Sequence, residues 1–409
     1  MAKNKNIEKI NYQDTDKKEN ISEDQPFEEY NTYYEKISLR FRTFKIVCVF
    51  VLCIFILGAF VFYGELFTYE NARYVLRDIN QILEEESDAP AGRISFDSDG
   101  EMDFSIYRSN LVVAGNSSVK IIGKSGNVKL TDKTQFISPT IETSDKYCIV
   151  YSLGAYNLSV YNSVARVADM RFDYPIFDVD VSDRGYIAVM TQSREYRCCV
   201  YLYNSDFKLL STYNKTYYPC SVSISDNSSE VYITTFSAID GTYNTKLESY
   251  GFSSATPRFT YSCDISIPFD AYATDSGNTV LIGEDAIVFL DKDGKKVNDH
   301  RPSEDIKSYH FSSGVFTVLL SDNQTTLINY DAEGDILYQA SVSDASSAYN
   351  FDNRNFIVCS DTLIDITSRP EMSYSFSNVP QTLLYSDGYI YLCNVDSILP
   401  VNIINNNGE

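Results

Sequence analysis

The chain has 409 residues, with 34 Lys and Arg against 56 Asp and Glu, which gives a net charge of −22. Residues 1–64 hold nine basic and nine acidic side chains, so the rest of the chain carries the whole negative charge. A surface that acidic repels nucleic acid and anionic polymers or headgroups, which excludes nucleic-acid partners, and it favours cations, basic peptides or neutral partners. A requirement for solubility alone would also account for it.

Residues 1–43 are polar, mixed in charge and poor in aliphatic side chains. A segment of that composition cannot bury a core, so we expect a disordered tail.

An apolar stretch follows at Ile46–Tyr63, eighteen residues without a charge. At about 1.5 Å per residue, a helix of that length spans roughly 27 Å, close to the hydrocarbon core of a bilayer. The stretch is longer than the apolar core of a cleaved signal peptide and starts far from the N-terminus. We therefore predict a single transmembrane helix at residues 44–64. Cations between Lys36 and Lys45 place residues 1–43 in the cytoplasm and the C-terminal part outside the cell membrane.

Residues 65–92 are expected to form an amphipathic helix and a linker. Apolar side chains recur three and four residues apart between Ala72 and Leu83, which predicts a helix over residues 65–86. Pro90 and Gly92 end it. The apolar stripe could join two copies of the chain as a homodimer, or it could lie on the domain that follows.

From Arg93 onward the sequence repeats a pattern of short strands. A short alternating strand precedes most of the repeated apolar runs, and a strand, a tight turn and another strand follow most of them. Gly126, Gly294 and Gly334 supply the positive φ that such turns need. Four strands in about 40 residues make the unit of a propeller blade. The eight apolar runs are LVVAG at 111, YCIVYS at 147, YIAVMT at 186, VYITT at 231, VLIG at 280, VFTVLL at 315, FIVCS at 356 and YIYLC at 389.

The strand order and turn placement over residues 93–404 resemble the WD40-like and quinoprotein-like β-propellers. The Trp-Asp and Gly-His signatures of WD40 repeats are missing, and the chain has no Trp. The layout of a tail, one span and a Tyr-rich propeller is similar to membrane-anchored propellers of Gram-positive bacteria whose function is unknown. Eight pairs of first and second strands predict an all-β, eight-bladed β-propeller, with seven blades as the alternative.

The last repeat lacks a fourth strand, because the chain ends in a short tail at residues 405–409. A spare strand at Arg93–Asp97 alternates Ile94 and Phe96 with polar neighbours. Propellers that resemble this one often complete the last blade with an N-terminal strand. We predict that Arg93–Asp97 pairs with Ile398–Ile404 and covers an edge that would otherwise invite aggregation.

The cysteines do not suggest a disulfide framework, because seven of the nine follow the span, an odd number, and the domain is large. One or two disulfides remain compatible with the sequence. Cys148, Cys359 and Cys393 lie in apolar runs and are interpreted as buried small hydrophobes. The adjacent Cys198 and Cys199 resemble a pair that quinoprotein dehydrogenases carry over their cofactor. However, the Trp floor of that site is missing, and strand alternation would point one Cys to the core and one away.

Three acidic loops offer oxygen ligands for calcium, at Asp97–Asp103, Asp291–Gly294 and Asp331–Asp335. The second and third occupy the repeated turn position, where Asp and Gly form turns, and the first lacks the EF-hand pattern. The only histidines are His300 and His310, and no hydrolase or phosphate-binding motif is present. We assign no catalytic, cofactor-binding or metal-binding residue and expect no cofactor.

The chain has 33 Tyr and 24 Phe. These rings could stack on sugars or peptides at a propeller face. Tyr147, Tyr186 and Tyr389 lie at strand positions where packing between blades is the simpler explanation.

These features predict a single-pass membrane protein that presents an extracytoplasmic propeller in the cell envelope. The leading hypothesis is a non-enzymatic binding or scaffold module for other envelope proteins or peptides. The alternatives are a ligand receptor or regulator that signals to the cytoplasmic tail, and an enzyme with its site on the propeller face.

Overall fold

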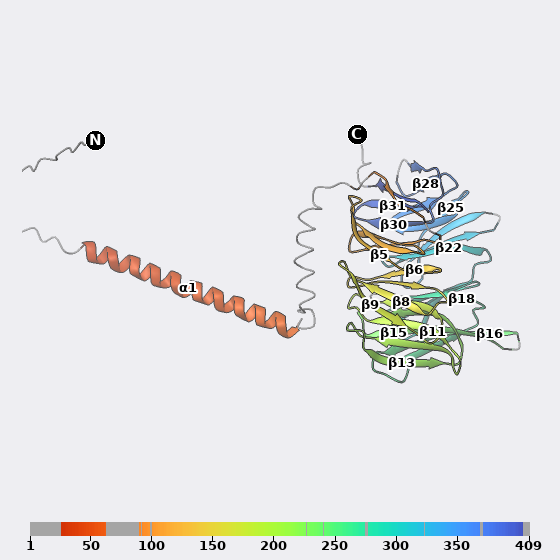
Figure 1. Ribbon diagram of the computed structural model, residues 1–409, viewed down its shortest axis with the longest axis horizontal. Helices are drawn as coiled ribbons and strands as arrows, with labels where there is room; N and C mark the ends of the chain where they lie inside the picture. Colours follow the sequence, from red (N-terminus) through yellow and green to blue (C-terminus); the bar gives the residue numbers. More distant parts are fainter. Residues whose placement is uncertain are drawn as a thin grey trace, which may run out of the picture. The chain divides into compact units, whose positions relative to one another are not determined.

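The computed structural model describes residues 26–62, 90, 92–98, 100–225, 227–239, 241–274, 277–322, 324–368 and 371–403. The chain divides into two units between Leu83 and Glu84, and each is described by itself (Figure 1). The amphipathic helix expected at residues 65–86, with its homodimer contact, lies outside the described residues, as does the tail at residues 405–409.

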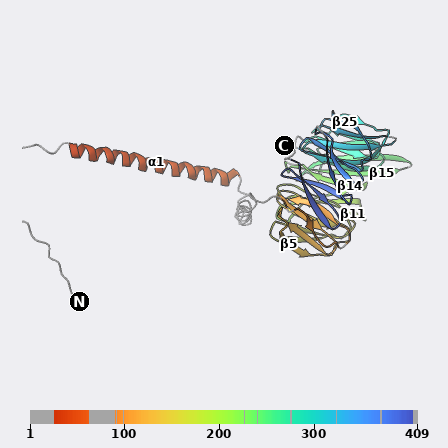
Figure 2. The same ribbon diagram turned by 90° about the horizontal axis from the view of Figure 1, so that it is seen from above.

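The first unit contains α1 (Pro26–Phe62), a single helix of 37 residues (Figure 2). It begins at Pro26, so residues 26–43, for which we expected disorder, are helical. Proline suits the first turn of a helix, and elongation from an established apolar helix adds one hydrogen bond for each residue that is fixed. Among the described residues, no helix is long and apolar enough to cross a membrane.

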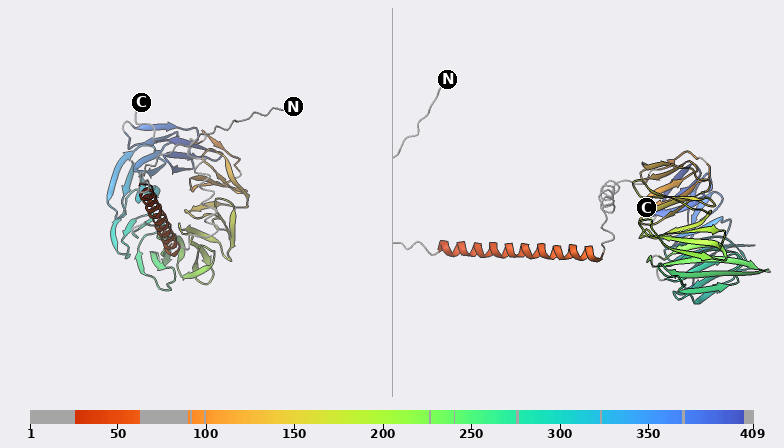
Figure 3. Two further views of the ribbon diagram at one scale, coloured as in Figure 1. Left: turned by 90° about the vertical axis from the view of Figure 1, so that its left-hand side faces the viewer. Right: turned by 60° about the horizontal axis from the view of Figure 1, so that its bottom comes forward.

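The second unit is a β-propeller of eight blades, each a four-stranded antiparallel sheet. Figure 3 shows the blades arranged around one axis. The prediction of eight blades is confirmed, and the alternative of seven is wrong. In each of the first seven blades, four consecutive strands run from the inside of the ring to its outside, because each strand pairs with the next one along the chain.

The strands fall into four layers, from the axis outward. The first strands are β2 (Asp103–Tyr107), β6 (Pro139–Thr143), β10 (Ile176–Val181), β14 (Tyr218–Ile224), β18 (Pro268–Ala273), β22 (Asp305–Ser312), β26 (Ser347–Phe351) and β30 (Thr382–Ser386). The second strands are β3 (Asn110–Ala114), β7 (Cys148–Ser152), β11 (Ile187–Ser193), β15 (Glu230–Ile239), β19 (Thr279–Gly283), β23 (Val315–Ser321), β27 (Arg354–Val358) and β31 (Tyr389–Cys393). The third strands are β4 (Ser118–Ile122), β8 (Asn157–Tyr161), β12 (Arg197–Tyr203), β16 (Thr242–Gly251), β20 (Ile287–Leu290), β24 (Thr325–Tyr330), β28 (Thr362–Asp365) and β32 (Ser397–Asn402). The fourth strands are β5 (Val128–Lys133), β9 (Arg166–Arg171), β13 (Leu209–Lys215), β17 (Phe259–Cys263), β21 (Lys296–His300), β25 (Ile336–Val342), β29 (Met372–Ser375) and β1 (Ile94–Ser95).

The ring has two faces, which the strand directions define. Connections from first to second and from third to fourth strands lie on one face, here called the turn face. Connections from second to third strands and from blade to blade lie on the other, here called the loop face. The hairpin of β15 and β16 extends past its neighbours on the loop face (Figure 1). The two strands pair as far as Ile239 and Thr242, whereas β14 and β17 stop opposite Phe236 and Thr245.

The core consists of eight apolar clusters, one between each pair of neighbouring blades in the described part of the ring. A blade is covered on both faces, so its second strand is buried on both sides. All residues of β3, β7 and β19 are buried. This burial explains why the second strands appear in the sequence as continuous apolar runs rather than as alternating ones.

Glycine permits the tight turns between third and fourth strands. Gly294 has a φ of 76° and Gly334 a φ of 86°, and their N–H groups donate to Asp291 O at 2.9 Å and Asp331 O at 3.2 Å. A residue with a Cβ rarely adopts this conformation, so the expectation of positive φ at these glycines is confirmed.

The predicted closure of the last blade by the strand within Arg93–Asp97 is confirmed, but the pairing is shorter than expected, because Ile398 is the one residue of Ile398–Ile404 that takes part. Strand β1 pairs with β32 as the outermost strand of the last blade, with Ile94 opposite Ile398. The pairing involves the N-terminal end of β32, and Phe96 N donates to Asp396 O at 3.0 Å just beyond it. Ile94 is 5% exposed, and the ring of Phe96 packs 5.9 Å from that of Phe104 in blade 1. The first strand of the propeller therefore clasps its last blade.

Candidate binding face

Five carboxyl groups lie on the inner strands of blades 1, 2, 3 and 5, and we call them the inner carboxyls. Each belongs to the innermost strand of its blade, and the other four all act on the pKa of Glu142, so the five share one electrostatic environment. In the described part of the chain, none of them forms an ion pair with a basic side chain. The inner carboxyls are Asp103 on β2, Glu142 on β6, Asp178 and Asp180 on β10, and Asp270 on β18.

Four of the inner carboxyls accept hydrogen bonds from the backbone. An innermost strand is a sheet edge, so its outward N–H groups need partners other than a strand. Asp103 Oδ2 accepts from Ile141 N of the next blade at 2.7 Å. Asp178 and Asp180 accept in the same way from N–H groups of β14, at 2.7 and 2.5 Å. The second oxygen of each accepts from the residue that follows it, as Asp270 Oδ1 also does. These aspartates therefore link blade 1 to blade 2 and blade 3 to blade 4.

Glu142 is the exception among the five. Its carboxyl accepts no hydrogen bond from the described residues. Burial raises the pKa of Glu142 well above its usual value, and repulsion from Asp180, Asp178, Asp103 and Asp270 raises it further. The neutral form of Glu142 is therefore favoured relative to that of an isolated glutamate, and a cation nearby would favour the charged form.

Aromatic side chains occupy the inner strands of blades 5 to 8, so blade 5 carries both Asp270 and Tyr272. Three stacked pairs have ring centroids 5.4, 5.6 and 5.5 Å apart, and a fourth, Phe269 with Tyr309, has centroids 6.2 Å apart. His310 contacts two of these rings, each at 5.1 Å, and burial lowers its pKa to about 4. The inner ring is therefore acidic on one side and aromatic on the other. The residues of the three closer pairs are Tyr272, Phe311, Tyr349, Phe351 and Tyr385.

Exposed apolar side chains concentrate on the loop face of blades 2 to 5, and we call them the apolar arc. They are 38–77% exposed. The other exposed large apolar side chains of the described propeller are on outermost strands or on the loop face of blade 8. Exposed apolar side chains that gather on one face of neighbouring blades mark an interaction site more often than singly scattered apolar residues do. The apolar arc consists of Ile137, Leu153, Tyr156, Phe177, Tyr196, Tyr218, Tyr243, Ile267 and Phe269.

Part of the arc is held in place by contacts between aromatic and basic groups. The guanidinium of Arg197 lies 4.4 Å from the centroid of the Tyr218 ring. The ring of Phe236 lies 5.8 Å from that of Tyr218 on its own sheet. A ring that is already oriented loses little entropy when a partner covers it.

A buried ion pair lies away from this face, between blades 3 and 4. Lys215 Nζ donates to Glu248 Oε2 at 2.8 Å and to Tyr250 OH at 2.5 Å. A cavity of about 250 Å³ beside it is lined by Tyr213, Tyr250 and hydroxyl-bearing residues. Burial lowers the pKa of Lys215. The amine already has two acceptors in the next blade, one of them a carboxylate, so this pair fastens two blades together rather than offering a free charge.

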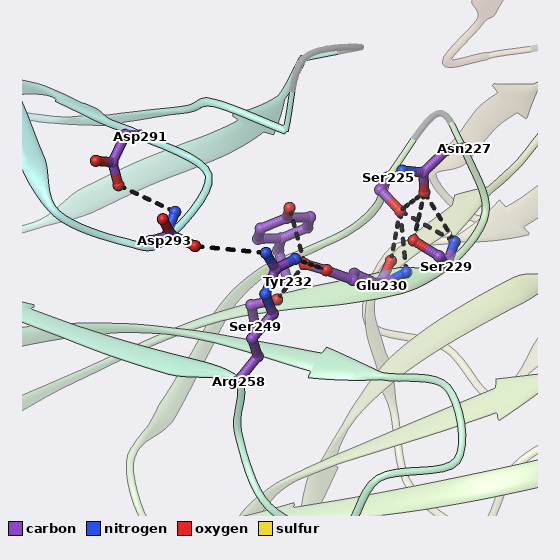
Figure 4. Close-up of polar contacts among 9 residues, drawn as sticks. All are labelled: Ser225, Asn227, Ser229, Glu230, Tyr232, Ser249, Arg258, Asp291 and Asp293. Atoms are coloured by element: carbon purple, nitrogen blue, oxygen red, sulfur yellow. Dashed lines mark hydrogen bonds and ion pairs between the residues drawn. The ribbon is translucent and has the colours of Figure 1, made fainter.

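A second polar cluster lies on the turn face, where blades 4 and 5 meet (Figure 4). Glu230 Oε2 accepts from Ser249 Oγ at 2.7 Å and from Tyr232 OH at 3.2 Å, and Oε1 accepts from Arg258. The guanidinium of Arg258 also lies 3.5 Å from a carboxylate oxygen of Asp293 in the next blade. Each charge in Figure 4 faces a partner within the cluster, so the cluster joins the blades.

The structure also places the cysteines that the sequence singled out. Cys198 and Cys199 are free, and both are buried, at 0% and 5% exposure. Alternation does send them to opposite faces of β12, but a neighbouring blade covers each face, so the expectation that one would point away from the core is wrong. Cys148, Cys359 and Cys393 are buried as predicted.

The acidic loops and histidines have structural contacts. Asp291 and Asp331 each accept two backbone N–H groups within their own turns, which confirms their role as turn formers. Asp103 serves the inner ring, while Asp99, in the same loop, lies outside the described residues. His300 Nε2 lies 2.8 Å from Gly334 O. In the described residues, no group of three His, Cys, Asp or Glu side chains is arranged to hold a metal ion.

The predicted packing of tyrosines between blades is confirmed at two positions. Tyr147 OH donates to Ser205 O of the next blade at 3.0 Å. The ring of Tyr186 lies 4.7 Å from that of Phe252 in the next blade. Both side chains therefore pack between blades.

Sequence reasoning missed both parts of the candidate face. The inner carboxyls had a usable signal, because Asp103, Asp178 and Asp270 recur in first strands, in DFSIY, FDVDV and FDAYA. No comparable signal in the sequence pointed to Glu142 or to the apolar arc. A pattern of four strands does not say which loops of different blades meet on one face until the ring is built.

The fold defines the chain as an eight-bladed β-propeller with a candidate binding surface on its loop face. The chain belongs to the family described as "Family of unknown function (DUF5711)", whose model matches residues 91–397. No curated protein matches the sequence.

Solved structures similar to this chain are propellers. Sqt1 of Saccharomyces cerevisiae is similar with a TM-score of 0.57 and 9% identity, over 77% of this chain and 100% of that one. BamB of Moraxella catarrhalis is similar with a TM-score of 0.53 and 11% identity, over 78% of this chain and 99% of that one. At these identities the similarity shows the fold alone.

Proposed function

We propose that this protein is a membrane-anchored, extracytoplasmic propeller that acts as a non-enzymatic binding or scaffold module in the cell envelope. The single observation that carries the binding role is the apolar arc on one face of the ring. Nine exposed apolar side chains from four neighbouring blades form a surface that a protein or peptide partner would bury.

The proposed anchor is the apolar stretch at Ile46–Tyr63, and the flanking cations support an N-terminus in the cytoplasm. External protease on intact cells should remove the propeller and spare residues 1–43. Protection of the propeller would reverse this topology.

The binding role is tested by photo-crosslinking from chosen positions of the full-length protein in native membranes. A crosslinking residue at Tyr156, in the arc, should capture a protein partner that one at Leu337 does not. Leu337, 57% exposed on the outermost strand β25, is the matched control.

The decisive comparison uses substitutions that remove exposed apolar surface. Ile137→Asn with Leu153→Asn should abolish the crosslink, while Val128→Asn with Leu337→Asn should leave it unchanged. Both pairs are exposed, so neither is expected to lower the melting temperature by more than a few degrees. Equal loss in both pairs would contradict a binding role for the arc.

A receptor or regulator is the second candidate, and one observation favours it. Strand β1, which closes the ring through Ile94 and Ile398, is the first strand after the N-terminal segment. A change at this clasp could therefore be passed along the chain toward the tail. If the protein signals, deletion of residues 1–43 should abolish whatever phenotype the full-length protein produces in cells. The same deletion should leave partner binding intact, whether or not the protein signals.

A further inference from the structure

We propose that the inner carboxyls receive a cationic side chain, the arginine or lysine of a protein segment that docks on the apolar arc. This inference rests on the proposed binding function and specifies the chemistry of the partner. It follows from charge complementarity, from the depth at which the carboxyls lie, and from a buried hydroxyl beside them that forms no hydrogen bond of ordinary geometry.

The charge argument concerns five acidic groups on one side of the inner ring. None of them has a basic partner among the described residues, although the described propeller forms ion pairs elsewhere, such as Lys215 with Glu248. The five carboxyls are half-buried, and a crowded acidic group without a counter-charge is partly neutralised by protons or recruits a cation. A guanidinium or ammonium group from outside would supply the missing charge.

The strand register gives the depth of each carboxyl below the loop face. Asp103 is paired with Ala114, the last residue of β3, and so lies near the loop face. Asp178 and Asp270 each lie one residue farther from the loop face than Asp103 does. Asp180 and Glu142 lie deeper still, opposite the second residues of β11 and β7, toward the turn face. Two residues along a strand cover about 7 Å, a distance comparable with the length of an extended arginine or lysine side chain. A side chain that enters from the loop face can therefore pass the outer carboxyls and reach the inner ones.

The buried hydroxyl is Ser221 Oγ on β14, which lies between the strands that carry Asp178 and Asp270. Ser221 is 4% exposed, and its Oγ forms no hydrogen bond of ordinary geometry with the described atoms. It interacts weakly with the carboxyl of Asp270 and the thiol of Cys220 and lowers the pKa of both, against the larger effect of burial, which raises them. A buried hydroxyl without a well-formed hydrogen bond is costly, and a cationic N–H donor would give it one.

The entrance suits the stem of such a side chain. Phe177, Tyr218 and Phe269 lie at the beginnings of the inner strands and are 38–46% exposed. Lysine and arginine place apolar stems along aromatic surfaces while the charged end reaches a polar group. The carboxyls are spread along several strands, and no group of three in the described residues is arranged for a metal ion, which favours an organic cation.

Entry of a cation should release a proton from Glu142, because the pKa of that group is raised by burial and by four like charges. The other titratable groups that face it are Cys148, Tyr151 and Tyr272, and burial followed by nearby carboxyls raises the pKa of each. These three stay protonated near neutral pH, so Glu142 is the group that would lose a proton.

The test uses the full-length protein and a fluorescein-labelled peptide of alternating leucine and arginine, with anisotropy measured at about 150 mM salt to suppress long-range attraction. A second peptide carries citrulline, which has the shape of arginine without its charge. The arginine peptide should bind about tenfold more tightly than the citrulline peptide. Glu142→Gln with Asp270→Asn should remove that difference.

The matched control is Asp344→Asn with Asp361→Asn, which changes the net charge equally at two exposed positions on the loop face of blades 6 and 7. It should change the affinity for the arginine peptide by less than about twofold, a limit set by screening of exposed charges. Calorimetry in buffers of different ionisation enthalpy should detect proton release with the unaltered protein and not with Glu142→Gln. Equal losses in both variant pairs, or equal affinity for both peptides, would overturn the inference.

Three further outcomes separate this inference from the proposed function. If Ile137→Asn with Leu153→Asn abolishes binding of both peptides while the carboxyl variants change neither, the arc binds a partner but the inner carboxyls take no cation. If spermidine displaces the arginine peptide at equal concentration, the carboxyls bind a polyamine and the proposed protein side chain is overturned. If the arc variants change neither peptide's binding nor the crosslinks, the proposed function fails as well.

Discussion

The inner strands of blades 1 to 4 and those of blades 6 to 8 belong to one continuous ring. However, different groups accept hydrogen bonds from the free backbone N–H groups of these strands. In blades 1 and 3, aspartates accept the free N–H groups of the next blade, as Asp103 does for Ile141 N. In blade 6 a neutral hydroxyl does this, because Ser308 Oγ accepts from Ala348 N at 3.2 Å. Stacked aromatic rings fill the remaining space on that side.

The comparison shows that one inner edge on the aromatic side is satisfied by a neutral hydroxyl, and that the charged groups which link blades there are basic, such as Lys307 donating to Ala345 O. The carboxyls of the acidic side are therefore not a general requirement of the inner edge. Glu142 makes the point most clearly, since it accepts no hydrogen bond from the described residues and only adds repulsion to its surroundings. A charged group that costs stability and has no hydrogen-bond or ion-pair partner among the described residues is a candidate for function.

The aromatic side should be the more fragile to truncation. Phe351 is 5% exposed and contacts His310, Tyr349 and Tyr385. Phe351→Ala should lower the free energy of unfolding by about 3–5 kcal/mol, the usual cost of a large buried ring. Urea unfolding followed by tyrosine fluorescence measures this loss, with Phe177→Ala, 38% exposed on the loop face, as the control. A loss no greater than that of the control would show that the aromatic side is not a packed core.

The acidic side should lose stability through its hydrogen bonds. Asp178→Ala leaves Val222 N without its acceptor at 2.7 Å and should cost about 1–3 kcal/mol, reduced by relief of repulsion at Glu142. Ser308→Ala removes one weaker acceptor on the aromatic side and should cost less. The midpoints of urea unfolding at pH 7 compare the two, and a larger loss for Ser308→Ala would reverse this assignment of the edge contacts.

The architecture could be predicted because its signals are local. Apolar runs such as the one that became β3 recur with turns at regular spacing, and glycines such as Gly294 mark the tight turns. The clasp was also predictable, because Ile94 and Phe96 form an alternating strand that no earlier strand could pair with. In these cases the residues that form the element are also the residues that reveal it.

The candidate face could not be predicted because it is assembled from different blades. Leu153 and Tyr218 are 65 positions apart in the chain, and nothing in either neighbourhood says that both are exposed on the loop face. The burial of Cys199 was misjudged for the same reason. Alternation gives the direction of a side chain, whereas only the neighbouring blade decides whether that direction leads to solvent.

The pH dependence of the aromatic side follows from His310. Burial lowers its pKa to about 4, below the ordinary value of 6.5, so the folded state resists protonation. The stability that depends on the neutral ring is present above about pH 6.5 and is lost as the pH falls toward 4, by about 1–2 kcal/mol at pH 5. The His310→Phe variant should lose less stability than the unaltered protein between pH 7 and pH 5. Identical losses, measured by urea unfolding at both pH values, would show that His310 does not control this range.

The acidic side should show the opposite dependence, through Glu142. Its pKa is raised in the folded state, so the neutral form contributes stability that is fully present below the ordinary pKa of a glutamate and is lost as the pH rises through the folded value. Glu142→Gln keeps the shape of the side chain and removes the charge. Its melting temperature should exceed that of the unaltered protein by a few degrees at pH 8, and the two should converge near pH 4. The exposed Asp361→Asn is the control and should show no such convergence.

If Glu142→Gln melts at the same temperature as the unaltered protein at both pH values, the carboxyl exerts no strain on the ring. The contrast between the two sides would then rest on hydrogen bonds alone. If it melts lower at pH 8, the ionised carboxyl has a stabilising partner inside the propeller, and the space proposed for an incoming cation is already taken.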